Sequence, residues 1–169
     1  MNNNYINPFV ESVCDFFSTM LGSEVKRGDI RLTRRQPVGA REIAVKIQFA
    51  GTTNGILVFF LPAATAIEVA HRFIGLDMET VDDCVLDAVS EFANIVAGGA
   101  KSRIQAGLNG PPLDLSLPEI IRDSHNFTQI LSRSAWLEVP FASEIGPFEI
   151  LIHLEMNNRK RRNDESVDC

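Results

Sequence analysis

The sequence predicts an α/β fold in which long helices pack on a largely antiparallel sheet. The chain of 169 residues is 45% apolar and 22% charged, a composition typical of soluble globular proteins with one hydrophobic core. Its apolar periodicity gives the order helix, three strands, two helices, and then two or three strands. Because strands and helices do not alternate regularly along this order, the pattern argues against a parallel doubly wound sheet.

We expect a single folded domain over residues 1–156 and a disordered polar tail over residues 157–169. The tail contains a basic run at residues 159–162, which could contact an acidic partner but is more typical of a solvated terminus. The net charge of the chain is −6, and a surface of that sign repels phosphate backbones. Nucleic-acid binding is therefore not expected.

Neither a membrane span nor a secretion signal is predicted. The longest apolar stretch, residues 55–64, is too short to cross a bilayer, and the N-terminus carries neither a basic region nor a long apolar run. The three cysteines, Cys14, Cys84 and Cys169, are far apart in the sequence and indicate neither a zinc site nor a disulfide framework. These features favour a cytoplasmic protein with reduced thiols.

The first part of the chain is expected to form one helix and three strands. In residues 5–21 apolar side chains recur at spacings of three and four, as in an amphipathic helix, and Gly22 is a natural stop. Residues 25–33 form a short, mixed strand-like run. Residues 41–49 alternate as in a half-buried strand, whereas residues 55–61 are apolar on both faces and suit a central strand. The turn between these last two strands makes them a hairpin.

A short helix and further strands extend this pattern. A helix is expected over about 62–74, because proline suits the first helical turn and Gly75 suits the end. Two later strands are expected near 135–141 and 148–155. Residues 113–121 can supply a shorter one.

The third and longest helix, expected over about 81–105, is the most informative element. Thr80 and Asp83 have the spacing of a capping box at its start. One face is apolar and can pack on the sheet; it consists of Leu86, Val89, Ala93, Val96, Ala97 and Ala100. A polar stripe follows the spacing i, i+4, i+7 and i+11, which places its members on one side of a helix. These members are Asp87, Glu91, Asn94 and Gly98.

The stripe has an ordinary interpretation and a functional one. The polar face of an amphipathic helix is usually only its solvated face. Two features favour a functional site instead. No Lys or Arg lies between Asp87 and Gly98 to form the usual i,i+4 ion pairs. In addition, Gly98 and Gly99 each cost about 1 kcal/mol relative to alanine within a helix, and such glycines commonly permit close approach of another surface.

At this point the residues resemble a known motif, that of the CheC/CheX/FliY chemotaxis phosphatases. The single motif and the opening helix, which reads Asn-Pro-Phe-Val-Glu over residues 7–11, are most similar to the CheX branch. The resemblance covers most of residues 5–155. The motif is carried here by Asp87, Glu91, Asn94, Gly98 and Pro118.

The resemblance implies an enzyme that removes the phosphoryl group from the aspartate of a phosphorylated response regulator such as CheY. It implies that Asn94 enters the partner's active site and orients the attacking water, and that Glu91 anchors the partner through a lysine. Asp87, Gly98 and Pro118 would support the motif. The resemblance also implies a homodimer, Mg²⁺ held by the phosphorylated partner, and no cofactor in this chain.

The chemistry agrees with these two roles. Phosphoryl transfer passes through a loose transition state, so positioning the water matters more than removing its proton. A neutral amide can hold the water without repelling the phosphoryl oxygens, whereas a carboxylate beside that anion needs a cation. Asn94 therefore suits the water, and Glu91 suits an ion pair.

Two alternatives stay open. The chain could be a non-catalytic signalling or flagellar-switch interaction module on the same fold. Separately, Asn7, Glu11 and Cys14 repeat the motif spacing on the first helix, with Cys14 in place of the amide. This repeat is either a decayed second site or part of an ordinary amphipathic helix with a buried cysteine.

Overall fold

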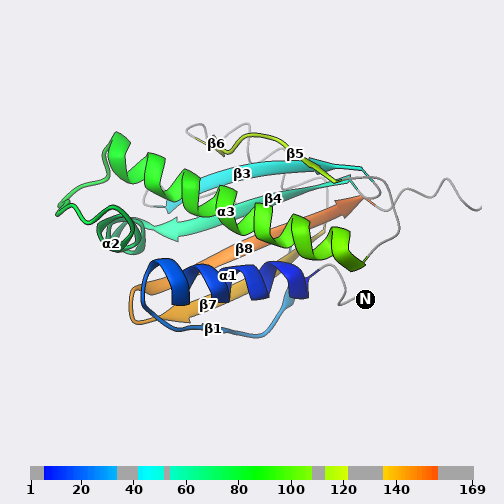
Figure 1. The fold of residues 1–169 in the computed structure, drawn as a ribbon, viewed down its shortest axis with the longest axis horizontal. Helices are drawn as coiled ribbons and strands as arrows, with labels where there is room; N and C mark the ends of the chain where they lie inside the picture. The colour runs from blue at the N-terminus through cyan, green and yellow to red at the C-terminus, as the bar shows by residue number, and fades with distance from the viewer. Residues whose placement is uncertain (1–5, 34–41, 52–53, 108–112, 122–134, 156–169) are drawn as a thin grey trace, which may run out of the picture.

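The computed structural model describes residues 6–33, 42–51, 54–107, 113–121 and 135–155, and its helices lie on one side of an antiparallel sheet (Figure 1). Its helices are α1 (Asn7–Met20), α2 (Ala63–Ile74) and α3 (Asp83–Gly107). Its strands are β1 (Val25–Arg27), β2 (Arg31–Thr33), β3 (Glu42–Ala50), β4 (Asn54–Pro62), β5 (Asp114–Leu115), β6 (Glu119–Ile120), β7 (Trp136–Ser143) and β8 (Gly146–Glu155). The predicted fold class is confirmed.

The strands form one sheet with the order β1-β7-β8-β4-β3-β5, in which all pairings are antiparallel. β2 also pairs with β7, and β6 also pairs with β3. β4 lies between β3 and β8, and its residues 57–61 are buried on both faces, as predicted for a central strand. The predicted hairpin is present and pairs Phe49 of β3 with Gly55 of β4.

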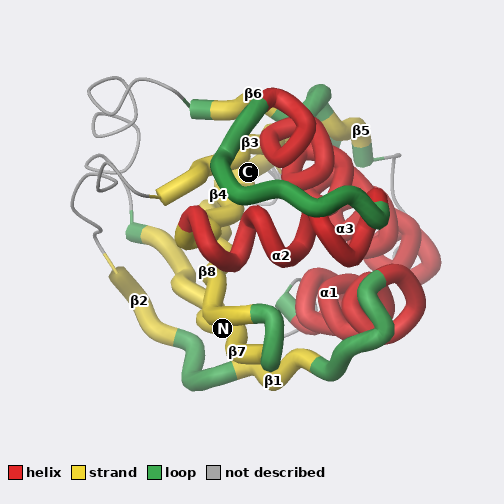
Figure 2. Tube along the Cα trace, turned by 90° about the vertical axis from the view of Figure 1, so that its left-hand side faces the viewer, coloured by secondary structure: helices red, strands yellow, loops and turns green. Residues whose placement is uncertain are grey.

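The main core lies between the helices and the sheet. Figure 2 shows the three helices grouped against the same face of the strands. Phe92 of α3 is central to this core: its ring centroid is 4.8 Å from that of Phe16, 5.6 Å from Phe59 and 5.8 Å from Phe148. These rings come from α3, α1, β4 and β8, so their burial holds α1 and α3 on the sheet. A smaller apolar cluster, which includes Trp136, lies on the opposite face.

The expected ends of the first two helices are also found. α1 begins and ends within two residues of the predicted range, and Gly22 follows it with a positive φ of 59°. α2 starts directly after β4 and ends at Ile74, and its C-cap is Gly75, whose φ of 71° lies in the left-handed region. The Gly75 N–H donates to the carbonyl oxygen of His71 at 2.8 Å, which closes the last turn.

Three local predictions need correction. Residues 25–33 form two strands, because β1 and β2 each pair separately with β7. Residues 113–121 likewise supply two short strands, β5 and β6, on β3. The α3 cap is Asp82 and not Thr80: the Asp82 carboxylate accepts the Val85 N–H at 3.0 Å, so the helix begins at Asp83. The predicted tail lies outside the described residues, and the single-domain boundary stays a prediction.

Candidate functional site

Helix α3 presents the candidate site because its opposite face is fixed in the core. The predicted packing residues are buried except Leu86, which is only half-buried. The sequence reasoning missed Phe92, although it stands between Glu91 and Asn94 in the sequence and is fully buried. At 100° per residue, Phe92 points well away from both neighbours. The buried residues of α3 are Val85, Ala88, Val89, Phe92, Ala93, Val96, Ala97, Ala100 and Ile104.

The predicted polar stripe lies on the outer side of α3. Asp87 and Glu91 are exposed, and Asn94 and Gly98 are half-buried. Across the described part of the chain, no side-chain hydrogen bond or ion pair engages Asp87, Glu91 or Asn94. A carboxylate and a carboxamide thus share one helical turn, and both are available to a molecule outside the chain.

Pro118 lies on a separate element that is firmly attached beside α3. It is half-buried in the segment that carries β5 and β6, and β6 contacts α3. Besides the pairing of β5 and β6 with β3, three side-chain or loop contacts near Pro118 hold this segment. The Ser116 N–H donates to the Gln48 carbonyl at 2.9 Å, Ser116 Oγ accepts the Gln48 N–H at 2.9 Å, and Lys46 Nζ lies 2.6 Å from Glu119 Oε2. The Lys46 side chain is only 14% exposed, so this ion pair is partly shielded from solvent.

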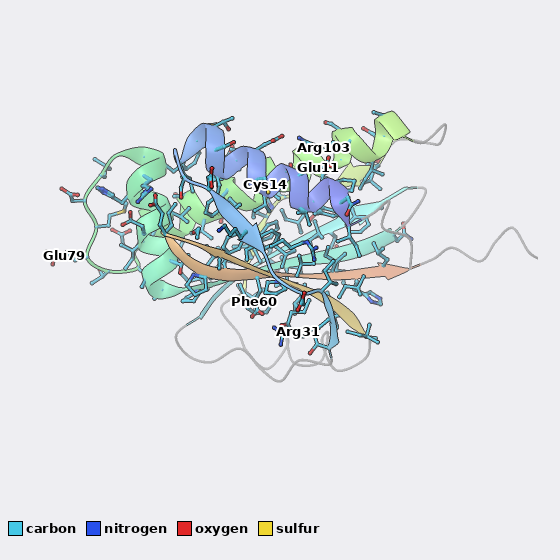
Figure 3. All side chains as sticks on the ribbon, turned by 90° about the horizontal axis from the view of Figure 1, so that it is seen from below. Glu11, Cys14, Arg31, Phe60, Glu79 and Arg103 are labelled. Atoms are coloured by element: carbon cyan, nitrogen blue, oxygen red, sulfur yellow. The ribbon has the colours of Figure 1, made fainter. Side chains whose placement is uncertain are left out.

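The motif-like repeat on α1 is engaged within the chain. Arg103 Nε lies 3.3 Å from Glu11 Oε2, and the same guanidinium pairs with Asp15. Figure 3 shows Glu11, Cys14 and Arg103 together where α1 runs beside α3. Burial raises the pKa of the Cys14 thiol, and the carboxylates of Asp15 and Glu11 raise it further. Glu11 therefore ties α1 to α3, which favours the structural interpretation of this repeat.

The two adjacent glycines of α3 have different surroundings. A Cβ built on Gly99 would collide with the hydroxyl of Ser12, so Gly99 is needed where α1 crosses α3. A Cβ built on Gly98 would meet nothing within 4 Å. We expect these glycines to permit close approach of another surface. At Gly99 that surface is α1 of the same chain, whereas Gly98 faces open space.

The described residues contain no cluster of three or more His, Cys, Asp or Glu side chains that could hold a metal ion. Within those same residues, no helix has both the length and the apolar character that crossing a membrane requires.

Comparison with known proteins assigns the part of the chain that carries this site to a family. The family model described as "Chemotaxis phosphatase CheX" matches residues 43–142. That range includes α3 and the segment carrying Pro118, and therefore all five motif residues. Among curated proteins, no match is found.

Solved structures share the fold over nearly the whole chain. A CheC-like superfamily protein from Shewanella sp. PV-4 is 25% identical with a TM-score of 0.74, covering 92% of this chain and 99% of its own. A chain of the CheX-CheY-BeF3-Mg²⁺ complex from Borrelia burgdorferi is 24% identical with a TM-score of 0.73, covering 89% and 97%. The FliM middle domain from Vibrio alginolyticus is 12% identical with a TM-score of 0.61, covering 89% and 90%.

Proposed function

The chain belongs to the CheX family of chemotaxis phosphatases, and from this we propose that it accelerates hydrolysis of the aspartyl phosphate of a CheY-like response regulator. One observation carries the proposal: Asn94 and Glu91 share a turn on the outer side of α3, and neither side chain has a partner among the described residues. Polar side chains that serve only the fold are normally hydrogen-bonded when shielded from water. A half-buried carboxamide without a partner is instead available for an external ligand.

Asn94 is proposed to orient the attacking water. Hydrolysis of an acyl phosphate needs a water in line with the bond that breaks, and the transition state is loose, with negative charge spread over the phosphoryl oxygens. The carboxamide oxygen can accept a hydrogen bond from that water, and the amide as a whole carries no charge that would repel the phosphoryl group. Its contribution is therefore positional.

Glu91 is proposed to anchor the partner through a lysine beside the phosphoryl site. An exposed ion pair contributes little in water, but its strength rises when docking removes solvent from the pair. The carboxylate lies three residues before Asn94, so an ion pair there would also fix how α3 lies against the partner. Asp87, Gly98 and Pro118 would support this docking.

The metal ion needed for this chemistry is proposed to belong to the partner. The Borrelia burgdorferi structure is a complex of CheX with CheY, BeF3 and Mg²⁺. By analogy, Mg²⁺ in the phosphorylated receiver would neutralise charge on the phosphoryl oxygens. This chain would then supply the amide and the anchoring carboxylate and would need no cofactor of its own.

The test is a dephosphorylation assay with purified CheY-type receiver domains. The unsubstituted protein should accelerate phosphate loss, Asn94→Ala should abolish the acceleration, and Glu91→Ala should reduce it severely. Gln105→Ala removes another half-buried amide from the outer side of α3, and Glu24→Ala removes an exposed carboxylate elsewhere, so both should behave like the parent. Equal activity of the parent, Asn94→Ala and Glu91→Ala would refute the proposal.

The competing function is a non-catalytic interaction module. The FliM middle domain shares the fold of this chain, and this is the observation that supports the alternative. It predicts tight receiver binding with an unchanged phosphoryl lifetime. The same assay separates the two functions when binding and phosphate loss are both measured. The Glu91–Asn94 pair favours the phosphatase.

We also propose that the protein acts in the cytoplasm as a homodimer. Its partner would be a cytoplasmic receiver, and strand edges at the two ends of the sheet offer a route to pairing between copies. Sedimentation at concentrations from micromolar upward would test the dimer.

A further inference from the structure

We infer that Gly98 is a docking residue, at which the response regulator approaches the backbone of α3 more closely than any side chain at this position would permit. This inference rests on the proposed function, because it takes the receiver as the partner. It gives Gly98, which lies one turn beyond Asn94 in the same motif, a defined role in that docking: the feature that matters there is the absence of a Cβ.

A glycine in a helix interior needs a reason, because it weakens the helix relative to alanine. The first ordinary reason is a left-handed backbone, and Gly98 does not have one: among the described residues, the glycines with positive φ are Gly22, Gly51, Gly75 and Gly146. The second reason is close packing inside the chain. That reason applies to Gly99, which faces Ser12, and not to Gly98, where a Cβ would meet only open space.

The third ordinary reason is a hinge, and the contacts of this turn oppose it. α3 runs without interruption from Asp83 to Gly107. The Ser102 hydroxyl donates to the Gly98 carbonyl at 3.1 Å, and Arg103 Nη1 donates to the Gly99 carbonyl at 3.1 Å. Each glycine carbonyl thus has an additional side-chain donor four residues on. The helix continues through both glycines, so the missing side chain at position 98 changes the shape of the surface without interrupting α3.

The position of Gly98 explains why that shape would matter. It lies four residues after Asn94, about 6 Å along the helix axis, on the same stripe. An asparagine side chain is short, so it can reach a phosphoryl group inside another protein only if the helix backbone itself lies against the mouth of that site. On the N-terminal side of Asn94 stands Glu91, which would pair with the partner. On the C-terminal side, a bulky residue at position 98 would hold the helix away.

The test measures binding of a CheY-type receiver that has been activated with beryllofluoride and Mg²⁺, so that affinity is read without hydrolysis. Gly98→Ala should raise the thermal midpoint of the free protein, because alanine favours the helix. The same substitution should weaken receiver binding about tenfold, since overpacking a close contact costs about as much as one decade of affinity. Gly98→Met should weaken binding further while the protein remains folded.

Gly107→Ala is the matched control. A Cβ at Gly107 also meets open space, but this residue is the last of α3 and lies 13 residues beyond Asn94. It should leave affinity at the parent value. If the parent binds and hydrolyses while Gly98→Ala and Gly98→Met bind equally well, the inference is wrong and the proposed function stands. If the parent neither binds the activated receiver nor speeds phosphate loss, the proposed function and the inference fail together.

Discussion

Two amides lie on the outer side of α3, and their neighbours distinguish them. Asn94 follows Glu91 by three residues, so an amide and a carboxylate share a turn. Gln105 follows Ser102 by three residues and Lys101 by four, so no acid occupies the positions one turn before it. Both amides are half-buried, so exposure alone does not single out Asn94. What distinguishes Asn94 is the carboxylate of Glu91 on the same helical turn. Gln105 lacks such a neighbour, so it is a matched reference for substitutions of Asn94.

At position 94 the neutral amide should be essential. Asn94→Asp preserves the size of the side chain but places a negative charge beside the phosphoryl oxygens. We expect the phosphatase rate to fall by about a hundredfold or more, as when a positioned polar group is lost from a transition state. Gln105→Glu makes the same amide-to-acid change on the same side of the helix and should keep the parent rate. A rate for Asn94→Asp close to the parent would contradict the role given to the amide.

Single residues also show where sequence reasoning stops. The stripe was predictable because helical spacing alone places Asp87, Glu91, Asn94 and Gly98 together. The difference between Gly98 and Gly99 was not, because it depends on Ser12, which is 87 residues away from Gly99 in the sequence. The pairing of Arg103 with Glu11 is hidden for the same reason. Periodicity describes one element at a time, and these contacts join two elements.

At the scale of elements, the long periodic helices and strands and the β3–β4 hairpin were predicted, whereas the pairing of the short strands was not. β3, β4 and α3 have long apolar periodicities that identify them without a partner. β5 and β6 are two residues each and exist only because β3 offers its edge. The cap of α3 was misplaced because Thr80 and Asp82 are both good capping residues, and only the geometry of the turn selects one.

The cap assignment has a direct test in protein stability. Asp82→Ala removes the acceptor of the Val85 N–H and should lower the free energy of unfolding by about 1 kcal/mol. Asp82→Asn keeps an acceptor and should recover most of that loss. Thr80→Ala should have little effect, although it is the residue that the capping-box spacing suggests. Denaturant titrations of the three variants measure these differences. A larger loss for Thr80→Ala than for Asp82→Ala would restore the original prediction.

The crossing of α1 and α3 should depend on Gly99 and Ser12 together. Gly99→Ala places a methyl group against the buried Ser12 hydroxyl and should lower the free energy of unfolding by roughly 1 kcal/mol or more, after the gain in helix propensity. Ser12→Ala removes that hydroxyl, and the new methyl would then lie 3.4 Å from the Ser12 Cβ and 3.2 Å from Arg103 Nη1, the end of a flexible side chain that can shift slightly.

The double variant should therefore be more stable than Gly99→Ala alone, and a double-mutant cycle measured by urea unfolding gives the coupling. Additive effects of the two substitutions would show that the hydroxyl is not what Gly99 accommodates.

At the scale of the whole molecule, charge is distributed unevenly around the candidate site. No Lys or Arg occurs from Phe73 to Ala100, which spans the end of α2 and most of α3. The acidic residues of this segment are all exposed: Asp77, Glu79, Asp82, Asp83, Asp87 and Glu91. Together with a net charge of −6, they give the loop before α3 and the first half of α3 a negative field. That field would attract a partner whose docking lysine meets Glu91.

This field should control how fast the receiver associates. The association rate with a beryllofluoride-activated receiver should fall as salt is raised, because salt screens charges beyond about 8 Å at physiological ionic strength. Asp87→Lys should slow association several-fold at low salt and flatten the salt dependence. Asp29→Lys makes the same change in net charge between β1 and β2, at the sheet edge remote from the strands beneath α3, and should act more weakly. Stopped-flow mixing at several salt concentrations measures both rates. Equal slowing by the two substitutions would mean that net charge alone steers the encounter, and the acidic surface beside Glu91 would then have no directing role.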